Sequence, residues 1–468
     1  MNKYPRTYED IKSLAKTTGR KIPELLAMAS QNDPFYIMPA QAKQAEWFAA
    51  LWAQFDLPAG VHLRRIHYKL ISQAAPLFMV DGRRYENTEA CWQYLGGASK
   101  AARCLGLVDA DAFEDKRNPD PVVTREYVPL NDPSVILDWK QWGADIWDIP
   151  RINTDLAADL YWKIPRVECF GYLQSDSGQP FHLELISEKS TMDDVIIPLC
   201  RDLRINYAPA TGFQSITGVV AMLQRLRQAN KPGVVFYISD FDPAGSFMPP
   251  SVARQIEFWR TVYAPDLDVL LFPIVLTPEQ VKHYQLPPIP IKDSDKRQDN
   301  FLAKYGVAGA TELDALEALH PGELAKIIQK ETLPYRDTVY ALRAYKVREQ
   351  ANSAVSAQWS EITHPYRWRL DRLKEQAADV LDGYQNALET LRQEMDTKLK
   401  PIARELESLR QAVKTEFEEF DPVLPDRHES PIALPVQFDG LFDSRRDYLR
   451  QLKFYKHIET SSGMEVML

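Results

Sequence analysis

The sequence predicts a mixed α/β protein in which a parallel α/β domain is combined with helical regions before and after it. Two observations predict this fold class. Strands and amphipathic helices alternate from Phe181 to about Asp337, and apolar residues recur at heptad spacing from about Tyr366 to Phe420. The chain of 468 residues is 45% hydrophobic and 26% charged, which suits several domains with their own cores and excludes a largely disordered chain.

The sequence lacks the features of membrane and secreted proteins. No stretch approaches the ~18 consecutive apolar residues of a membrane helix, and the N-terminus has no apolar signal-peptide core. The four cysteines are widely separated, without metal-ligand spacing, and we expect them to be reduced thiols. The sequence therefore predicts a cytoplasmic protein with no membrane partner.

Residues 1–58 are predicted to form a helical N-terminal segment. Apolar residues recur every three or four positions in residues 11–16, 22–30 and 44–55. The run NDPFY at residues 32–36 predicts a turn between two of these helices.

The pattern of residues 59–125 favours a winged-helix DNA-binding domain. A helix is predicted over residues 61–73, an Asp-Gly turn between apolar residues predicts a hairpin after it, and Thr88 is the expected N-cap of the next helix. That helix would direct Lys100 and Arg103 towards DNA. A generic helical bundle fits the same pattern and remains the alternative.

Charge is unevenly distributed along the chain. The 56 basic and 65 acidic residues give a net charge of −9, which is not typical of a nucleic-acid-binding protein. Between Gly60 and Cys104, however, there are seven Lys and Arg residues and three acids. A locally basic module can bind phosphate even on an acidic chain, and a solvated surface is the alternative.

Residues 126–178 have no clear period and are interpreted as an ordered connector, whereas residues 179–345 are predicted to form the parallel α/β domain. Near-continuous apolar strands alternate there with amphipathic helices, the pattern of a sheet that is covered on both faces. The expected strands are residues 182–187, 205–210, 234–239 and 269–276, separated by helices over residues 191–203, 215–230 and 251–263.

Residues 346–424 are predicted to form a long helical arm. Apolar residues follow alternating steps of three and four from Leu370 to Phe420, as in a coiled coil, and Pro401 is expected to bend or split this helix. Either a second chain or an antiparallel helix of the same chain would cover the apolar seam. Residues 425–468 are predicted to be a tail that begins as a loop and ends in a basic helix.

Carboxylates follow two of the predicted strands. Glu188 comes after the first strand, and Asp240 and Asp242 come after the third, in the run SDFDPAG. The carboxyl ends of parallel strands meet at one edge of a sheet, where open sheets bind ligands. Because hard oxygen ligands suit Mg²⁺, we predict that these three residues hold Mg²⁺ as a cofactor. A simple turn capped by Asp240 is the alternative.

These motifs resemble those of a known fold family. ISEKS at residues 186–190, the GF turn at Gly212-Phe213 and ISDFDPAG at residues 238–245 are together similar to the Toprim domain, the Mg²⁺-binding fold of topoisomerases, primases and related nucleases. The DxDPxG form resembles the A subunit of topoisomerase VI and its relative, the meiotic double-strand-break transesterase. The resemblance extends over residues 60–340.

The same family carries a tyrosine motif before its Toprim domain. Its winged-helix domain contains a motif of type R-x-x-[YF]-Y, whose last Tyr is the nucleophile. Arg64-Arg65-Ile66-His67-Tyr68 stands in the corresponding place, with His67 where the family usually has an aromatic residue. The resemblance thus implies a winged-helix domain followed by a Toprim domain, with Tyr68 as the catalytic residue.

The implied chemistry is the transfer of a DNA phosphate to tyrosine, which forms a 5′-phosphotyrosyl link. A tyrosine hydroxyl, with a free pKa of ~10, needs a nearby cation or base. Arg64, one helical turn before Tyr68, would stabilise the phosphorane or the phenolate, and His67 is either a general base or a polar neighbour. The expected DNA contacts are Arg65, Lys100, Arg103 and Lys189.

We therefore expect Mg²⁺-dependent cleavage of double-stranded DNA by a stand-alone bacterial or mobile-element relative of this family, associated with the nucleoid. A Toprim-type nuclease that hydrolyses DNA with the metal site alone, in defence or mobile-element biology, is one alternative. A DNA-binding structural protein that does not cleave is the other. The family shares its active site between protomers, which implies a homodimer. Strand passage would need a separate ATPase partner, because the sequence has no GHKL segment or Walker motif.

Overall fold

The computed structural model describes residues 5–115, 118–125, 127–128, 130–149, 160–172, 176–210, 214–291, 298–382 and 392–460. The chain divides into two compact units. The sheet unit comprises Met1–Tyr127, Gln179–Asp337 and Pro431–Leu468, and the arm unit comprises Val128–Gly178 and Thr338–Ser430. None of the described helices is long and apolar enough to cross a membrane.

The sheet unit is built on a five-stranded sheet with the order β6-β5-β7-β8-β9. Its strands are β5 (His182–Ser187), β6 (Asn206–Pro209), β7 (Gly233–Ile238), β8 (Val269–Val275) and β9 (Phe442–Asp443). The first four pair in parallel, and β9 pairs antiparallel with β8. The predicted alternation of strands and helices, and with it a mixed α/β fold with a largely parallel sheet, is confirmed.

Helices cover both faces of this sheet. The helices of the unit after β5 are α5 (Asp193–Leu203), α6 (Ile216–Ala229), α7 (Met248–Tyr263), α8 (Pro278–His283), α9 (Gln298–Tyr305), α10 (Leu313–Leu319), α11 (Glu323–Thr332), the 3₁₀ helix Leu333–Tyr335 and α14 (Tyr448–Thr460). Alternate residues of β7 divide between two cores: Val235 and Tyr237 pack with α6, α7 and α14, whereas Val234, Phe236 and Ile238 pack with α5, α10 and α11. This alternation follows from the two-residue period of a strand.

The N-terminal part of the sheet unit forms a helical cluster. Its helices are α1 (Tyr8–Thr18), the 3₁₀ helix Ile22–Leu25, α2 (Pro39–Gln54), α3 (Leu63–Ile71) and α4 (Glu89–Cys104). Helices α2, α3 and α4 share one core, and the predicted Asp-Gly hairpin lies before α4, with Gly82 at φ +80°. Thr88 caps α4 as predicted. The helix expected over residues 22–30 was wrong beyond Leu25, where the chain instead wraps around the carboxylate of Asp33.

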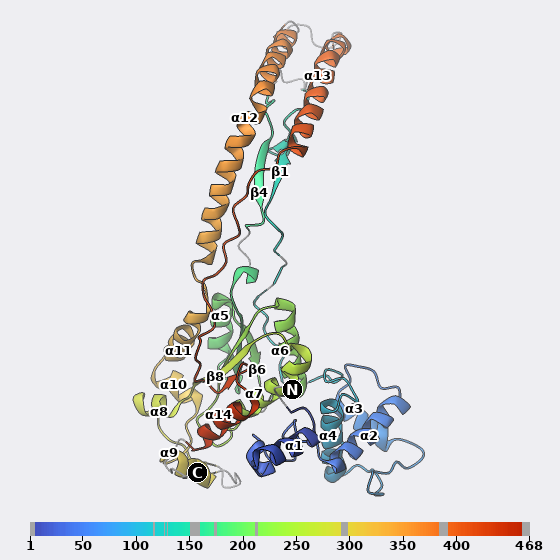
Figure 1. Cartoon of the computed structure of the whole chain (residues 1–468), viewed down its shortest axis with the longest axis vertical. Helices are drawn as coiled ribbons and strands as arrows, with labels where there is room; N and C mark the ends of the chain where they lie inside the picture. The colour runs from blue at the N-terminus through green and yellow to red at the C-terminus, as the bar shows by residue number, and fades with distance from the viewer. Residues whose placement is uncertain are drawn as a thin grey trace. The chain divides into compact units, whose positions relative to one another are not determined.

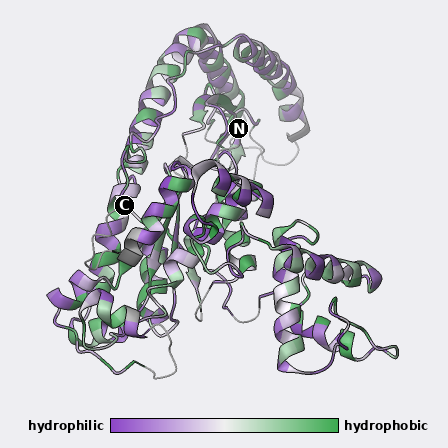
Figure 2. Ribbon diagram, turned by 60° about the horizontal axis from the view of Figure 1, so that its bottom comes forward, coloured by the Kyte–Doolittle hydropathy of each residue, from purple (hydrophilic) through white to green (hydrophobic). Residues whose placement is uncertain are grey.

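The arm unit contains two long helices, α12 (Tyr340–Asp382) and α13 (Arg392–Glu418), which lie side by side (Figure 1). Tyr366 donates a hydrogen bond to Glu416, and Arg369 pairs with Glu405, so the two helices are antiparallel. Hydrophobic and hydrophilic residues are interspersed along both helices (Figure 2). Buried apolar side chains of α12 and α13 share one core, so the seam is covered within the chain, which is one of the two alternatives that the heptad pattern left open.

Pro401 does not split the helix, because α13 runs through it from Arg392 to Glu418. The long helix also starts 26 residues earlier than Tyr366, at Tyr340. The heptad positions Tyr384, Ala387 and Leu391 lie outside the described residues. The buried heptad side chains in the shared core are Leu370, Leu373, Ala377, Met395, Leu399, Ile402, Leu406, Leu409 and Val413.

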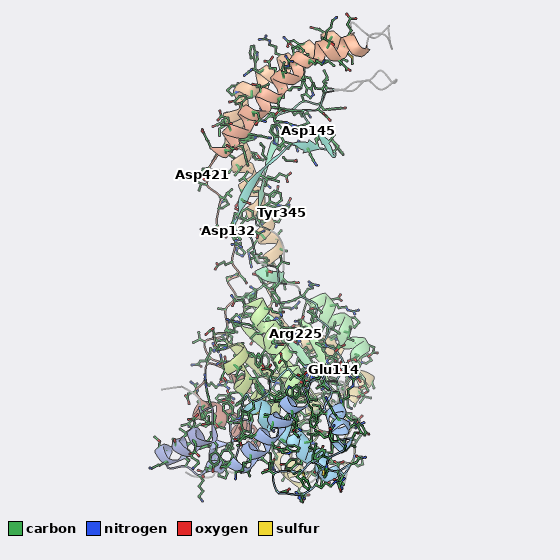
Figure 3. All side chains as sticks on the ribbon, turned by 90° about the vertical axis from the view of Figure 1, so that its right-hand side faces the viewer. Glu114, Asp132, Asp145, Arg225, Tyr345 and Asp421 are labelled. Carbon is green, nitrogen blue, oxygen red and sulfur yellow. The ribbon has the colours of Figure 1, made fainter. Side chains whose placement is uncertain are left out.

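Residues 126–178 are more than a connector. They contain β1 (Ser134–Asp138), β2 (Lys140–Gln141), β3 (Ala144–Asp145), β4 (Arg166–Phe170) and the 3₁₀ helix Asp176–Gly178, with β1 paired to β4 and β2 paired to β3. The backbone N–H of Cys169 on β4 donates to the side chain of Asn352, and the Trp359 indole donates to the carbonyl of Pro165. Asp145, labelled in Figure 3, pairs with Arg410 of α13. From Val128 to Gly178 this segment therefore belongs to the arm unit.

The tail beyond residue 425 is also part of a core. β9 extends the sheet, and Tyr448, Leu452 and Tyr455 of α14 are buried against α7. At the same place, the fully buried Arg254 pairs with Asp33 and Glu257 and donates to the Tyr448 hydroxyl. The predicted basic helix is confirmed, but its apolar face anchors it to the sheet unit.

Candidate functional site

The three predicted metal ligands follow neighbouring strands. β5 ends at Ser187, whose Cα partner on β7 is Ile238, and the backbone N–H of Glu188 donates to the Ile238 carbonyl at 3.0 Å. Asp240 and Asp242 follow β7 directly. The structure therefore brings the segments of Glu188 and the two aspartates to the same edge of the sheet, as expected for parallel strands.

The backbone around the two aspartates is tightly folded. Asp242 accepts a hydrogen bond from the backbone N–H of Gly245 at 2.5 Å. A Cβ on Gly245 would lie 2.2 Å from the Asp240 carbonyl oxygen, so only glycine fits this position. The glycine of the DxDPxG run thus has a steric reason, which is to let the chain turn back over Asp240.

Asp240 has both of its carboxylate oxygens occupied. Oδ1 accepts the backbone N–H of Leu313 at 2.7 Å, and Oδ2 pairs with Lys189 Nζ at 2.9 Å. Phe241 and Thr311 exchange backbone hydrogen bonds, and this bridge holds the start of α10 beside the end of β7. Asp240 is thereby fixed by both a strand neighbour and a helix N-terminus.

The start of α10 contributes two acids, Glu312 and Asp314, that were not among the predicted site residues. Lys189 Nζ lies 3.2 Å from Asp314 Oδ2 and 3.5 Å from Glu312 Oε2, in addition to its pair with Asp240. The only signal in the sequence was the acidic start of a predicted helix, TELDALEAL, which is common in helices of any function. Three carboxylates, those of Asp240, Glu312 and Asp314, thus lie within ion-pair distance of one lysine.

Glu188 is the least compensated member of this acid cluster (Glu188, Asp240, Asp242, Glu312 and Asp314). Burial, together with the negative charges of Asp240 and Asp242, raises the pKa of Glu188 to about 7. Its Oε2 atom is buried without a hydrogen-bond partner among the described residues. Burial also raises the pKa of Asp240, against the lowering effect of Leu313 N–H and Lys189.

The fit of this cluster to a divalent cation is partial. Carboxylates of this kind are the oxygen ligands that Mg²⁺ prefers, and the buried Oε2 of Glu188 has no hydrogen-bond partner among the residues that the structure describes. Within the described ranges, however, no three His, Cys, Asp or Glu side chains are already grouped to hold a metal ion. Lys189, predicted to contact DNA, instead takes the position next to Asp240.

Tyr68 lies on the exposed face of α3, with 54% of its surface accessible. Arg64, one turn earlier, and Arg65 are also exposed, and the Arg64 guanidinium lies 6.0 Å from the ring of Trp92. α3 packs into the core of the helical cluster, whereas the acids follow strands of the sheet. Tyr68, Arg64 and Arg65 therefore form one exposed cationic-aromatic surface (the Tyr68 surface).

His67 has a structural environment. It is buried, with Nδ1 2.7 Å from the Tyr85 hydroxyl and Nε2 3.1 Å from Asn87 Oδ1. The network assigns Nε2 as the donor to Asn87 and Nδ1 as the acceptor from Tyr85. With both ring nitrogens engaged inside the helical cluster, His67 is a polar neighbour of Tyr68 and not its general base.

Lys100 and Arg103 are engaged inside the protein, which does not suit their predicted role in DNA binding. Lys100 Nζ donates to the backbone carbonyl of Asn32 at 2.8 Å, and burial lowers its pKa. The Arg103 guanidinium lies 4.7 Å from the ring centre of Phe113, and burial lowers its pKa to about 10. The candidate phosphate contacts therefore move from α4 to α3.

A second carboxylate of β5, Glu184, has full compensation. Its side chain is 1% exposed and binds Arg225 with both oxygens at 2.9 Å. His182 and Asn206 also contact its Oε1, at 2.7 and 3.2 Å. Burial alone would raise the pKa of Glu184, but the charge of Arg225 and the contact with His182 lower it to about 2.

A cavity of about 360 Å³ lies in the sheet unit, between residues 114–115 and 118–121, the end of β6 and helix α6. Glu114 and Arg225, labelled in Figure 3, are among its lining residues. Arg225 is already committed to Glu184, and the acid cluster does not line this cavity. We therefore assign it no role in the candidate site.

The remaining parts of the expected motif have different outcomes. Gly212 and Phe213, the GF turn of the sequence motif, lie outside the described residues. The four cysteines are free thiols, three of them buried.

In comparisons with known proteins, no family model matches the chain, and no curated protein matches it.

Proposed function

We propose that this protein cleaves double-stranded DNA with the help of Mg²⁺, using Tyr68 as the nucleophile. The observation that carries the proposal is the cluster of Glu188, Asp240 and Asp242 at the carboxyl edge of a parallel sheet, where one buried oxygen of Glu188 has no hydrogen-bond partner within the described part of the chain. Burial and the two neighbouring aspartates disfavour the charged form of Glu188, so this arrangement adds little stability by itself and favours a cation-dependent role.

The proposed chemistry follows from the residues of the Tyr68 surface and of the acid cluster. The Tyr68 oxygen attacks a DNA phosphorus, a P–O bond to tyrosine forms, and the bond to the 3′ oxygen breaks. The tyrosine proton passes to solvent, and the 3′ oxygen takes up a proton as it leaves. Arg64, exposed one turn before Tyr68, offsets the negative charge that develops on the phosphate. A bound Mg²⁺ would supply charge stabilisation for the phosphate oxygens.

Tyr68 and the acid cluster belong to different cores, and we propose that they meet across a homodimer. This is the arrangement that the resemblance to topoisomerase VI A implies. A cytoplasmic, nucleoid-associated location and a separate ATPase partner belong to the same proposal.

Light scattering on the full chain with DNA tests the homodimer. A monomer at micromolar concentration would refute the arrangement in which Tyr68 of one protomer meets the acid cluster of the other. The arm gives no argument for the dimer, because α12 and α13 share one core within the chain.

The decisive experiment is plasmid cleavage with Mg²⁺, stopped by denaturant and scored for protein attached to 5′ ends. We expect covalent adducts with the wild-type chain and none with Tyr68→Phe, which removes a hydroxyl and little packing volume. Tyr161→Phe changes another exposed tyrosine and is the matched control. Asp240→Ala should abolish cleavage with the fold intact, and full activity in that variant would refute the metal assignment.

A hydrolytic nuclease is the second candidate. It is favoured by the fact that all members of the acid cluster come from the sheet unit around β5, β7 and α10, without any contribution from α3. This candidate predicts DNA cuts in Mg²⁺ without a covalent adduct, and continued cleavage by Tyr68→Phe. DNA binding without any cleavage, unchanged in Asp240→Ala, would instead identify the non-cleaving structural protein.

A further inference from the structure

Lys189 occupies an unusual position in the acid cluster. Its ammonium group lies 2.9 Å from Asp240 Oδ2, 3.2 Å from Asp314 Oδ2 and 3.5 Å from Glu312 Oε2. Its side chain is only 24% exposed, and Asp240 is 7% exposed, so this pair is shielded from solvent. Glu312 and Asp314 are 51% and 40% exposed and lie towards the surface.

We propose that Lys189 is an internal counter-ion that competes with the divalent cation for Asp240, and that it moves to Asp314 and Glu312 when the cation binds. This inference rests on the proposed metal-dependent function. An ammonium group and a divalent cation on one carboxylate oxygen repel each other, so Asp240 Oδ2 accommodates one or the other. Asp240 Oδ1 is already used by the Leu313 N–H, which leaves Oδ2 as the contested atom.

The two outer acids give the displaced lysine a place to go. Asp314 already contacts Lys189 and Glu312 lies just beyond, so the ammonium group keeps ionic partners when it leaves Asp240. Lys189 pairs with Asp240, whereas the buried Oε2 of Glu188 accepts no hydrogen bond from any described residue. The Glu188 oxygen is therefore the atom of the cluster that a metal ion would bind without displacing a partner.

Lys189 is therefore a positioning residue that sets the threshold for metal binding. Without it, the acids would bind the cation more tightly but would repel each other in the metal-free protein. With it, the metal-free site is partly neutralised, and binding requires exchange of one cation for another.

The test measures Mn²⁺ binding to the full chain without DNA, by the electron paramagnetic resonance signal of free Mn²⁺. Lys189→Met removes the charge and keeps the length of the side chain. We expect it to tighten Mn²⁺ binding roughly tenfold, since a partly buried ion pair no longer has to be broken. Lys189→Arg, which keeps the charge, should show no such gain. Lys326→Met removes another lysine that pairs with a glutamate, on α11, and should leave Mn²⁺ binding unchanged.

A second variant keeps the inference testable if Lys189→Met does not fold. Asp314→Asn removes one acceptor for the displaced lysine, so Mn²⁺ binding should weaken several-fold. A loss of that size can also come from one fewer negative charge near the metal, and the double variant separates the two causes. In the Lys189→Met background, Asp314→Asn should have little effect if Asp314 acts through Lys189, whereas an undiminished effect would overturn the exchange.

The outcomes separate this inference from the proposed function. Mn²⁺ binding by the wild-type chain that is lost in Asp240→Ala, together with unchanged affinity in Lys189→Met, would overturn the role of Lys189 and leave the metal site standing. No Mn²⁺ binding by either the wild-type chain or Lys189→Met would overturn the metal site and the lysine exchange together. Tighter binding in Lys189→Met alone supports both.

Discussion

Glu184 and Glu188 lie four residues apart, one within strand β5 and the other just past its end, and the protein treats them in opposite ways. Burial disfavours the charge of both. Arg225, His182 and Asn206 surround Glu184, and its pKa falls to about 2, whereas the nearest charges to Glu188 include two aspartates and its pKa rises to about 7. Because burial acts against the charge of both side chains, it is their partners that decide which carboxylate is held in its charged form and which one is not.

The largest effect on stability is expected for Glu184, the glutamate whose charge is balanced by Arg225. Arg225→Met removes the cation and leaves the Glu184 carboxylate buried, so we expect the free energy of unfolding to fall by about 3–5 kcal/mol. Urea unfolding followed by circular dichroism measures it. Arg227→Met on the same helix is the control, because Arg227 makes an exposed pair with Asp266. A loss below about 1 kcal/mol would show that Glu184 does not depend on Arg225.

Acid should weaken the fold through the same glutamate. The folded-state pKa of Glu184 lies below its unfolded value of 4.5, so its contribution is present above pH 4.5 and is lost as pH falls towards 2. We expect about 3 kcal/mol of lost stability from this group across that window. Glu184→Gln should flatten the dependence of stability on pH there, and an equally steep profile in the variant would contradict the assignment.

The uncompensated glutamate should show a smaller effect of the opposite sign. Glu188→Gln removes a charge that Asp240 and Asp242 repel, so the metal-free protein should gain about 0.5–1 kcal/mol at pH 8 in the presence of a chelator. Thermal unfolding with and without Mg²⁺ measures it. The metal should stabilise the wild-type chain more than the variant. Destabilisation of Glu188→Gln in the chelator would place Glu188 with Glu184, among the structural carboxylates.

The basic side chains divide in the same way, into those with partners inside the protein and those that are exposed. We expect replacement of the exposed ones to change DNA binding and to have the smallest effect on stability. Lys100 and Arg103 are committed to Asn32 and Phe113, while Arg64 and Arg65 are exposed on α3. Replacing Arg64 and Arg65 with Gln should flatten the slope of log K against log salt for DNA binding by roughly two. Lys100→Gln should leave the slope unchanged. The reverse result would return the DNA contacts to α4.

Much of the sheet was predictable, because its strands are apolar runs that end in charged or turn-forming residues. β5, β7 and β8 begin and end within one or two residues of their predicted bounds. The edge that gathers Glu188 and Asp240 follows from parallel pairing alone. Residues 126–178 were misjudged because strands of two to five residues are too short to show a period.

The partners of individual charges were not predictable. Glu312 and Asp314 reach Lys189 only because Phe241 and Thr311 pair across a long sequence separation. Nothing local in the sequence distinguishes the engaged Lys100 from the exposed Arg65, since both lie on amphipathic helices. In the same way, a heptad seam is identical whether its partner helix belongs to the same chain or to another one, and Pro401 fits within α13 although proline usually interrupts a helix.

The two-residue strand β9 has a consequence for the synthesis of the protein. It pairs with Leu270 and Leu271, on the edge at the start of β8, yet the ribosome makes it only after the whole arm. At ~5–20 residues per second, that edge waits about 10–30 s without its partner. An unpaired strand edge is a template for aggregation, so chaperones have this interval in which to act. Substitutions at Phe442 or Asp443 should therefore reduce the yield of folded protein in cells more than so short a strand suggests.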